Sequence, residues 1–304
     1  MRSIAVSVVR NCQDVITLTV LQHILLGVDR CVVIDNGSTD GTMERLRAIA
    51  RKVPRLEVRS DPSDFRPHEQ MNAVVNDALR GQRMLVIPFD ADECWHAPVS
   101  AVARRMVQTG DNVLSCPVVN FIQSRSVSAP TRFGWSLAFR RIATPYPYDM
   151  TRVVERRCSF VELAYPRKVL FCADGPVSVM KGNHGVDFPG KKIAECNVFP
   201  CLHLPLRTKL ELETRAFDFA PRMLAARSAP IESWQAGYFR DAVMNGGGEA
   251  EWRANSYGHG GLLDVFGTAR PTVVDFRLVS RMWRAYAYGL YLGIPMGARP
   301  RKAN

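Results

Sequence analysis

Three carboxylates fall within four residues, Asp90-Ala91-Asp92-Glu93, directly after the apolar run 84–89. Buried acids destabilise a fold unless water, a cation or basic groups compensate them. A hard divalent cation such as Mg2+ or Mn2+ prefers oxygen ligands and keeps positions open for substrate phosphates. The spacing therefore favours a site for a cation and a diphosphate, and the alternative is a solvated acidic loop that caps the following helix.

A second polar loop, residues 35–42 with the sequence Asp-Asn-Gly-Ser-Thr-Asp-Gly-Thr, follows another apolar run. Gly37 and Gly41 permit tight backbone turns, and the three residues between them can cap the next helix. The loop is neither a P-loop nor part of a dinucleotide fingerprint, because the required glycine and lysine spacings are missing. A capped turn explains the glycines and hydroxyl residues, but it does not explain why Asp35 ends the strand.

Strand and helix patterns alternate over the first hundred residues. Four short apolar runs have the composition of buried strands, and apolar residues at helical spacing separate them. Such alternation implies right-handed crossovers and an α/β fold whose mainly parallel sheet has helices on both faces. The predicted strands are 3–9, 31–34, 56–59 and 84–89, and the predicted helices are one from the cap Asp14 to Gly27, then 43–50 and 68–79.

Polar residues follow each of the four predicted strands. Because parallel strands end at the same edge of a sheet, these residues should converge in the crevice where ligands of open α/β folds bind. This convergence favours a ligand site over a solvated loop for the acidic motif. The residues are Arg10 and Asn11 after the first strand, Asp35 after the second, Asp61 and Asp64 after the third, and Asp90 and Asp92 after the fourth.

The pattern changes in the rest of the chain. We predict a helix over 98–108, an extended run over 113–122 and a helix over 207–219, whereas 122–181 carries no clear pattern. Segment 272–292 is predicted to be helical or mixed. Its Trp, Tyr and Arg residues either pack onto the core or form an interfacial helix against lipid, and we favour packing.

Composition indicates a packed soluble protein, because 47% of the 304 residues are hydrophobic and 23% are charged. The net charge of +11 comes from scattered basic residues, which favours phosphate-bearing partners and a solvated surface over a nucleic-acid stripe. Eight cysteines form no CxxC pair, which favours reduced, buried thiols. Neither a signal peptide nor an apolar run of ~20 residues is apparent. We therefore expect a cytoplasmic protein, with peripheral contact at the inner face of the membrane left open.

The chain resembles the family 2 glycosyltransferases, whose nucleotide-binding fold is called GT-A. The resemblance is specific over about residues 1–100 and patchy beyond, and Cys12 departs from the Glu that bacterial relatives carry there. It implies a GT-A catalytic domain over 1–205 and a largely helical C-terminal region over 206–304, packed on it. The matching segments are Val9-Arg10-Asn11, Asp35 to Thr42, Asp90 to Trp95, Lys181-Gly182-Asn183-His184 and Leu202 to Arg207.

The resemblance also implies which residues contact a nucleotide. Asp35 would hydrogen-bond the nucleobase or the ribose. Asp90 would contact the ribose, or would bind the metal directly or through a water molecule of its coordination shell. The backbone around the end of the first strand would line the base pocket. The implied binding residues are Val9, Arg10, Asn11, Asp35, Asp90 and Ala91.

Metal and proton chemistry are implied in the same way. Asp92 would ligate the cation, and His203 would add a further ligand unless it is simply a buried histidine. An inverting transfer needs a base that deprotonates the acceptor hydroxyl. Asp187 and His184 lie where relatives place this base, although His184 could be a turn histidine, and Glu93 is close to the sugar site in sequence.

These expectations describe a metal-dependent glycosyltransferase that uses Mn2+ or Mg2+. It would move a sugar from a nucleoside diphosphate donor, expected to be UDP-linked, to a hydroxyl with inversion. The acceptor would be a glycan, a lipid-linked intermediate or a small molecule. A sugar-nucleotide nucleotidyltransferase is disfavoured because residues 8–12 contain no glycine. A non-enzymatic carbohydrate- or nucleic-acid-binding protein is disfavoured because the acidic motif is intact.

Overall fold

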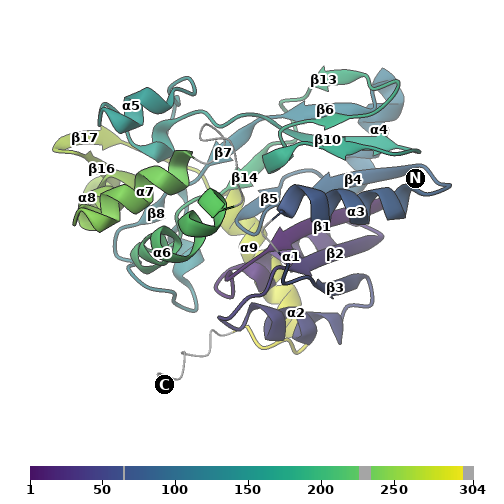
Figure 1. The fold of residues 1–304 in the computed structure, drawn as a ribbon, viewed down its shortest axis with the longest axis horizontal. Helices are drawn as coiled ribbons and strands as arrows, with labels where there is room; N and C mark the ends of the chain where they lie inside the picture. The colour runs from purple at the N-terminus through teal and green to yellow at the C-terminus, as the bar shows by residue number, and fades with distance from the viewer. Residues whose placement is uncertain (64–65, 226–233, 297–304) are drawn as a thin grey trace. The chain divides into compact units, whose positions relative to one another are not determined.

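A computed structural model describes residues 1–63, 66–225 and 234–296 of the chain (Figure 1). Asp64, one of the predicted polar residues, lies outside these ranges. The chain divides into two compact units. The first contains residues 1–118, 166–202 and the chain from Arg281 onward, and the second contains 119–165 and 203–280. The predicted division after residue 205 stays a prediction.

A seven-stranded sheet forms the centre of the first unit, in the order β13-β6-β10-β4-β1-β2-β3. The four strands from β4 to β3 are parallel, which confirms the predicted α/β sheet. Strand β10 runs antiparallel to both of its neighbours and was not predicted. The strands are β1 (Arg2–Val9), β2 (Arg30–Asp35), β3 (Leu56–Ser60), β4 (Met84–Pro88), β6 (Val113–Cys116), β10 (Lys168–Ala173) and β13 (Ile193–Glu195).

The predicted helices of the first unit are present, with two corrections at their starts. Val15 rather than Asp14 precedes the first helix. Gly41, with φ of 100°, precedes the second, and Asp40 accepts a hydrogen bond from the amide of Thr42 at 3.0 Å. Gly41 occupies the left-handed region that favours glycine. The helices are α1 (Ile16–Leu25), α2 (Thr42–Ala50), α3 (Pro67–Leu79) and α4 (Val99–Thr109).

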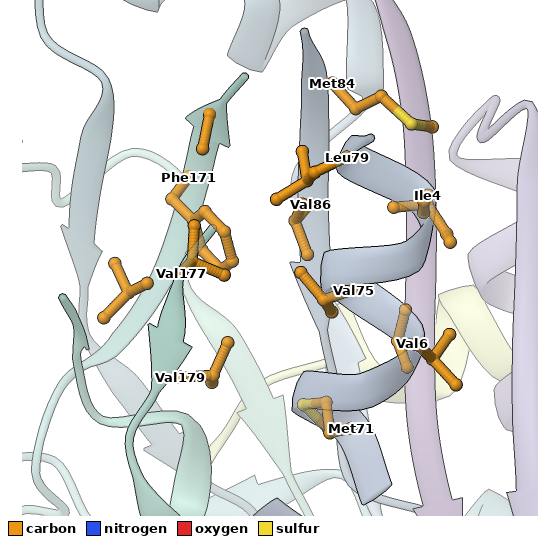
Figure 2. Close-up of a cluster of buried hydrophobic side chains, with 14 of the residues drawn as sticks. Ile4, Val6, Met71, Val75, Leu79, Met84, Val86, Phe171, Val177 and Val179 are labelled. Carbon is orange, nitrogen blue, oxygen red and sulfur yellow. The ribbon is translucent and has the colours of Figure 1, made fainter. Parts of the chain in front are cut away.

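The core on one face of the sheet lies beneath α3. Its apolar residues recur at helical spacing, so that one stripe of the helix faces the strands. Figure 1 shows α3 in front of the central strands, and Figure 2 shows its side chains against β1, β4 and β10. Burying each large aliphatic side chain contributes roughly 1.5–3 kcal/mol. The cluster includes Ile4, Val6, Met71, Val75, Leu79, Met84, Val86, Phe171, Val177 and Val179.

The smaller strands of the first unit include the β11–β12 pair and β5. Strands β7 and β14 lie where the chain passes from the first unit to the second. The predicted extended run 113–122 is divided between β6 and β7. The bounds are β5 (Glu93–Trp95), β7 (Val118–Asn120), β11 (Ser178–Val179), β12 (Val186–Asp187) and β14 (Cys201–His203).

The second unit combines short strands with helices. Four strands pair in the order β17-β16-β15-β8, and β18 pairs with β9. Helix α9 (Arg277–Tyr291) follows β18, as the mixed prediction for 272–292 requires, and its residues from Arg281 onward belong to the first unit. No helix within the described ranges is long and apolar enough to cross a membrane. The other elements are β8 (Gln123–Ser124), β9 (Arg140–Arg141), β15 (Ser256–Tyr257), β16 (Leu262–Val265), β17 (Thr268–Pro271), β18 (Val273–Val274), α5 (Met150–Val154), α6 (Lys209–Ala225), α7 (Trp234–Met244) and α8 (Gly248–Asn255).

Candidate functional site

The loops that follow β1 and β2 are joined by hydrogen bonds. Arg10 Nη1 donates to the carbonyl oxygen of Gly37 at 2.7 Å. The amide of Asn11 donates to Ser38 Oγ at 3.0 Å, and Asn11 Oδ1 accepts from the amide of Thr39 at 2.8 Å. Asn11 adopts a φ of 48° to make both contacts. The two loops are therefore held together by hydrogen bonds at the carboxyl edge of the sheet, as predicted for parallel strands.

The loop after β3 joins the same edge through Asn36. Its side-chain Nδ2 donates to the carbonyl oxygens of Asp61 at 2.8 Å and Ser63 at 3.0 Å. The amide of Asp61 in turn donates to the carbonyl oxygen of Asp35 at 2.9 Å. Hydrogen bonds thus join the ends of three successive strands around the carboxyl end of β2.

Asp35 is buried at the end of β2, opposite Val9 of β1 in the register of the sheet. Only 2% of the residue is exposed. One carboxylate oxygen, Oδ2, accepts from the amide of Ser38 at 3.1 Å. The other, Oδ1, is buried and has no hydrogen-bond partner among the described residues. An unmatched buried acceptor is costly, so this oxygen is ready for a donor group on a ligand.

The acidic motif forms a tight turn at the end of β4. The amide of Glu93 donates to the carbonyl oxygen of Asp90 at 3.1 Å, and the amide of Asp90 donates to Glu93 Oε2 at 3.0 Å. Thr19 Oγ1 of α1 donates to the carbonyl oxygen of Ala91 at 2.7 Å. Asp92 and Glu93 are both buried. Asp92 and Glu93 are therefore packed into the fold, whereas the side chain of Asp90 is 44% exposed.

Lys168 is a member of this site that the sequence did not reveal. It opens β10, is 3% exposed, and donates from Nζ to Asp90 Oδ2 at 2.7 Å. The same ammonium forms an ion pair with Glu93 Oε1. Burial alone would lower the pKa of Lys168, but attraction to Asp90 and Glu93 outweighs burial and raises that pKa above its ordinary value. A lone lysine at the start of an apolar strand is the signal that could have found it.

Asn183 completes the surroundings of Asp90. Its Nδ2 donates to Asp90 Oδ1 at 3.2 Å, so that both oxygens of this carboxylate are held by the protein. Asn183 belongs to the predicted Lys181–His184 segment, between β11 and β12. The next residue, His184, is exposed, and its Nδ1 lies 3.0 Å from the carbonyl oxygen of Arg167. The structure thus brings Asn183 to Asp90 and His184 to the backbone just before Lys168.

Two asparagines of α3 hold the hairpin that carries Asn183 and His184. Asn72 donates to the carbonyl oxygen of Val179 at 3.1 Å and accepts from its amide at 2.7 Å. Asn76 makes the same pair of contacts with Val177, at 3.0 and 2.8 Å. Because Asn72 and Asn76 lie one turn apart on α3, they act on β11 like a neighbouring strand.

The other two candidate bases have different surroundings. Asp187 ends β12, is exposed, and forms an ion pair with Lys191 at 2.5 Å. Among the contacts between described residues, none joins Asp187 to Asp90. Glu93 is buried, with Oε1 paired to Lys168 and Oε2 accepting from the amide of Asp90. These contacts make Glu93 a structural carboxylate.

His203 is a buried histidine at the end of β14. Its Nδ1 lies 2.9 Å from Asn120 Oδ1, and Asn120 Nδ2 donates to the carbonyl oxygen of Leu163 at 3.1 Å. An amide oxygen accepts, so Nδ1 carries the proton and Nε2 keeps its lone pair in the neutral ring. A hydrogen bond on the far nitrogen of this kind is typical of histidines that ligate metals.

The residue types predicted as metal ligands are present in both units. Asp92 is a buried carboxylate of the acidic motif in the first unit, and His203 is a buried imidazole of the second unit. Carboxylates and an imidazole are donors that suit Mn2+, so these residue types fit a divalent cation. Asp90, which was also predicted as a ligand, has both carboxylate oxygens held by Lys168 and Asn183.

Helix α1 supports the acidic motif from behind. Gln22 Nε2 donates to the carbonyl oxygen of Trp95 at 2.7 Å. His23 stacks on Phe89, with the ring centroids 3.8 Å apart, and its Nδ1 lies 2.8 Å from the carbonyl oxygen of Thr19. Complete burial lowers the pKa of His23 to about 4, although the contact with Thr19 opposes this shift. The ring is therefore neutral at physiological pH.

The buried His23 should make folding stability depend on pH. The unfolded chain binds a proton near the ordinary pKa of 6.5, whereas the folded chain does so only near 4. Stability from this group is present above pH 6.5 and is lost as the pH falls toward 4, by about 2 kcal/mol between pH 7 and pH 5. Urea unfolding at these two pH values should show this loss in the wild type and not in His23→Leu. The same pH dependence in both proteins would contradict it.

Comparisons with known proteins place the chain in a family. Residues 5–170, more than half of the chain, match the family described as "Glycosyl transferase family 2". No curated protein gives a significant sequence match. Similar solved structures include S. aureus TarS, with 15% identity and a TM-score of 0.35. The match covers 72% of this chain and 39% of the TarS chain.

A second similar structure is the mannosyltransferase PcManGT from Pyrobaculum calidifontis, solved in complex with GDP-Man and Mn2+. It is 16% identical, with a TM-score of 0.38, and the match covers 95% of this chain and 81% of that chain. The family match spans the parallel strands, the loops at their carboxyl edge and the acidic motif, and it carries the assignment of the GT-A fold. The chain therefore belongs to glycosyl transferase family 2.

Proposed function

We propose that this protein transfers a sugar from a nucleoside diphosphate donor, UDP-linked, to an acceptor hydroxyl with inversion. The unmatched, buried Oδ1 of Asp35 is the observation that carries the proposal. A carboxylate oxygen accepts a hydrogen bond, so it suits bases with an N–H on the pairing edge, such as uracil, thymine or guanine. Cytosine offers only its exocyclic amino group at that edge, because its ring nitrogen there is itself an acceptor. Val9, Arg10, Asn11 and Ala91 would line the nucleotide pocket.

A divalent cation would be held by Asp92, with His203 as the further ligand that the sequence predicts. When bound, the cation would stabilise the negative charge that develops on the leaving nucleoside diphosphate. Asp90 would orient the motif and the ribose side of the donor, because both of its oxygens are engaged by Lys168 and Asn183. These assignments rest on the chemistry of the ligand atoms and on the burial of the side chains.

We propose His184 as the general base. Its Nδ1 faces the carbonyl oxygen of Arg167, which fixes the proton on Nδ1 and makes Nε2 the basic nitrogen. Asp187 is the alternative base, and its ion pair with Lys191 disfavours it. The acceptor would be a glycan, a lipid-linked intermediate or a small molecule, and contact with the cytoplasmic face of a membrane would accompany a lipid-linked one.

A thermal-shift panel of UDP, GDP, CDP and dTDP, with and without Mn2+, tests donor binding. A ligand that binds only the folded state raises the unfolding midpoint. We expect the largest Mn2+-dependent shift with UDP. Asp35→Asn should weaken UDP binding by about 10- to 100-fold, because a hydrogen bond to a charged acceptor contributes roughly 1.5–3 kcal/mol.

Asp77→Asn is the matched control for this panel, because Asp77 lies on α3 with a side chain that is 53% exposed. It should respond to UDP as the wild type does. A UDP shift that is unchanged in Asp35→Asn would exclude the proposed role of Asp35. No shift with any of the four nucleotides would remove the proposed donor class.

A further inference from the structure

Lys168 neutralises part of the acidic motif from inside the protein. The motif carries three carboxylates, and Lys168 brings a buried ammonium into contact with two of them, Asp90 and Glu93. The lysine comes from β10, the antiparallel strand beside β4, so its position is set by the sheet. A buried ammonium on a strand cannot swing away as a surface lysine can.

Protein groups engage both carboxylates that Lys168 contacts. Asp90 Oδ1 accepts from Asn183, and Asp90 Oδ2 accepts from Lys168. Glu93 Oε1 pairs with Lys168, and Glu93 Oε2 accepts from the amide of Asp90. All four oxygens of these two residues therefore have protein partners.

We propose that Lys168 is a positioning residue that acts as a fixed internal cation for the acidic motif. This inference rests on the proposed function. Lys168 holds Asp90 and Glu93 in place on either side of Asp92 in the motif, and Asp92 is the proposed ligand of the divalent cation. It also lowers the negative charge that an incoming cation meets. The motif therefore binds a free cation weakly and binds it well together with a diphosphate, whose own charge completes the site.

Binding of Mn2+ alone, measured by titration calorimetry on the full chain, tests the proposal. Lys168→Met removes the charge and keeps the length of the side chain, and we expect Mn2+ to bind about tenfold tighter because one repulsive charge near the site is gone. Lys168→Arg keeps the charge and should bind Mn2+ as the wild type does. A lysine with only a structural role would give the opposite sign, since its loss would disorder the motif and weaken Mn2+ binding.

A second pair of variants covers the case in which Lys168→Met does not fold. Asp90→Asn and Asp90→Asn/Lys168→Met compare the presence and absence of Lys168 without leaving Asp90 as an unpaired charge. We expect the double variant to bind Mn2+ about tenfold tighter than Asp90→Asn, by the same electrostatic reason. Equal or weaker Mn2+ binding without Lys168, in either background, would overturn the proposal.

The readout separates this inference from the proposed function. One outcome is no nucleotide shift in the wild type together with tighter Mn2+ binding in Lys168→Met. This result would refute the proposed donor binding and support the proposed role of Lys168. The opposite outcome is a normal UDP shift in the wild type, with Mn2+ binding unchanged or weakened in both variants that lack Lys168. This result would support the proposed donor binding and refute the proposed role of Lys168. Absence of measurable Mn2+ binding in every variant would overturn the inference together with the cation role of Asp92.

Discussion

Glycosyl transfer should fall by about 10²- to 10³-fold when Asp92 is replaced by asparagine, as expected for removal of one preorganised electrostatic contact to the reacting groups. Asp92 is a buried carboxylate of the acidic motif and the proposed ligand of the cation. Asparagine keeps the shape of the side chain and removes its charge, so that the cation and the leaving diphosphate lose support. Initial rates of UDP release from a UDP-sugar at saturating Mn2+ measure the effect, and the Mn2+-dependent thermal shift with UDP should disappear as well.

Asp77→Asn serves as the control for a carboxylate removed elsewhere in the same unit, and its rate should equal that of the wild type. A rate for Asp92→Asn within a few-fold of the wild type would mean that Asp92 does not support the cation. A rate lost together with the cooperative unfolding transition would assign Asp92 a structural role instead. An intact transition with a slow rate is the expected combination.

The parallel half of the sheet could be predicted because its signals are local. Each of the strands β1 to β4 is a short apolar run, and each is separated from the next by a polar turn and a helical pattern. Since parallel strands end at one edge, the order of the elements was enough to bring Arg10, Asn11 and Asp35 together. The hydrogen bonds from Arg10 and Asn11 to the loop after β2 confirm this shared edge.

The partners of the acidic motif could not be predicted in the same way, because they are distant in sequence. Lys168 meets Asp90 across 78 positions, and Asn183 meets it across 93. The packing of the whole sheet decides which strand lies beside β4. The residue pattern within β10 does not reveal that β10 takes this position. The region 122–181 gave no pattern for a related reason, since its strands contain only two residues in the cases of β8 and β9.

His184 is the residue whose replacement should separate chemistry from donor binding. The contact of its Nδ1 with the carbonyl oxygen of Arg167 leaves Nε2 as the basic nitrogen. The contact of the preceding residue, Asn183, with Asp90 places the histidine next to the acidic motif in the fold. In His184→Gln we therefore expect kcat to fall by about 10²- to 10⁴-fold, the usual contribution of a general base. The UDP and Mn2+ thermal shift should stay unchanged, because the base acts on the acceptor.

Asp187→Asn and Glu93→Gln complete the comparison, because each removes one of the other two candidate bases. Asp187 is exposed and paired with Lys191, so its replacement should leave kcat near the wild-type value. Glu93 is buried against Lys168, so its replacement should lower the unfolding midpoint together with the rate. A loss of kcat in Asp187→Asn with full activity in His184→Gln would make Asp187 the base. It would also mean that Asp187 in β12, rather than His184 in the turn between β11 and β12, faces the acceptor. Asn72 and Asn76 hold this hairpin in place.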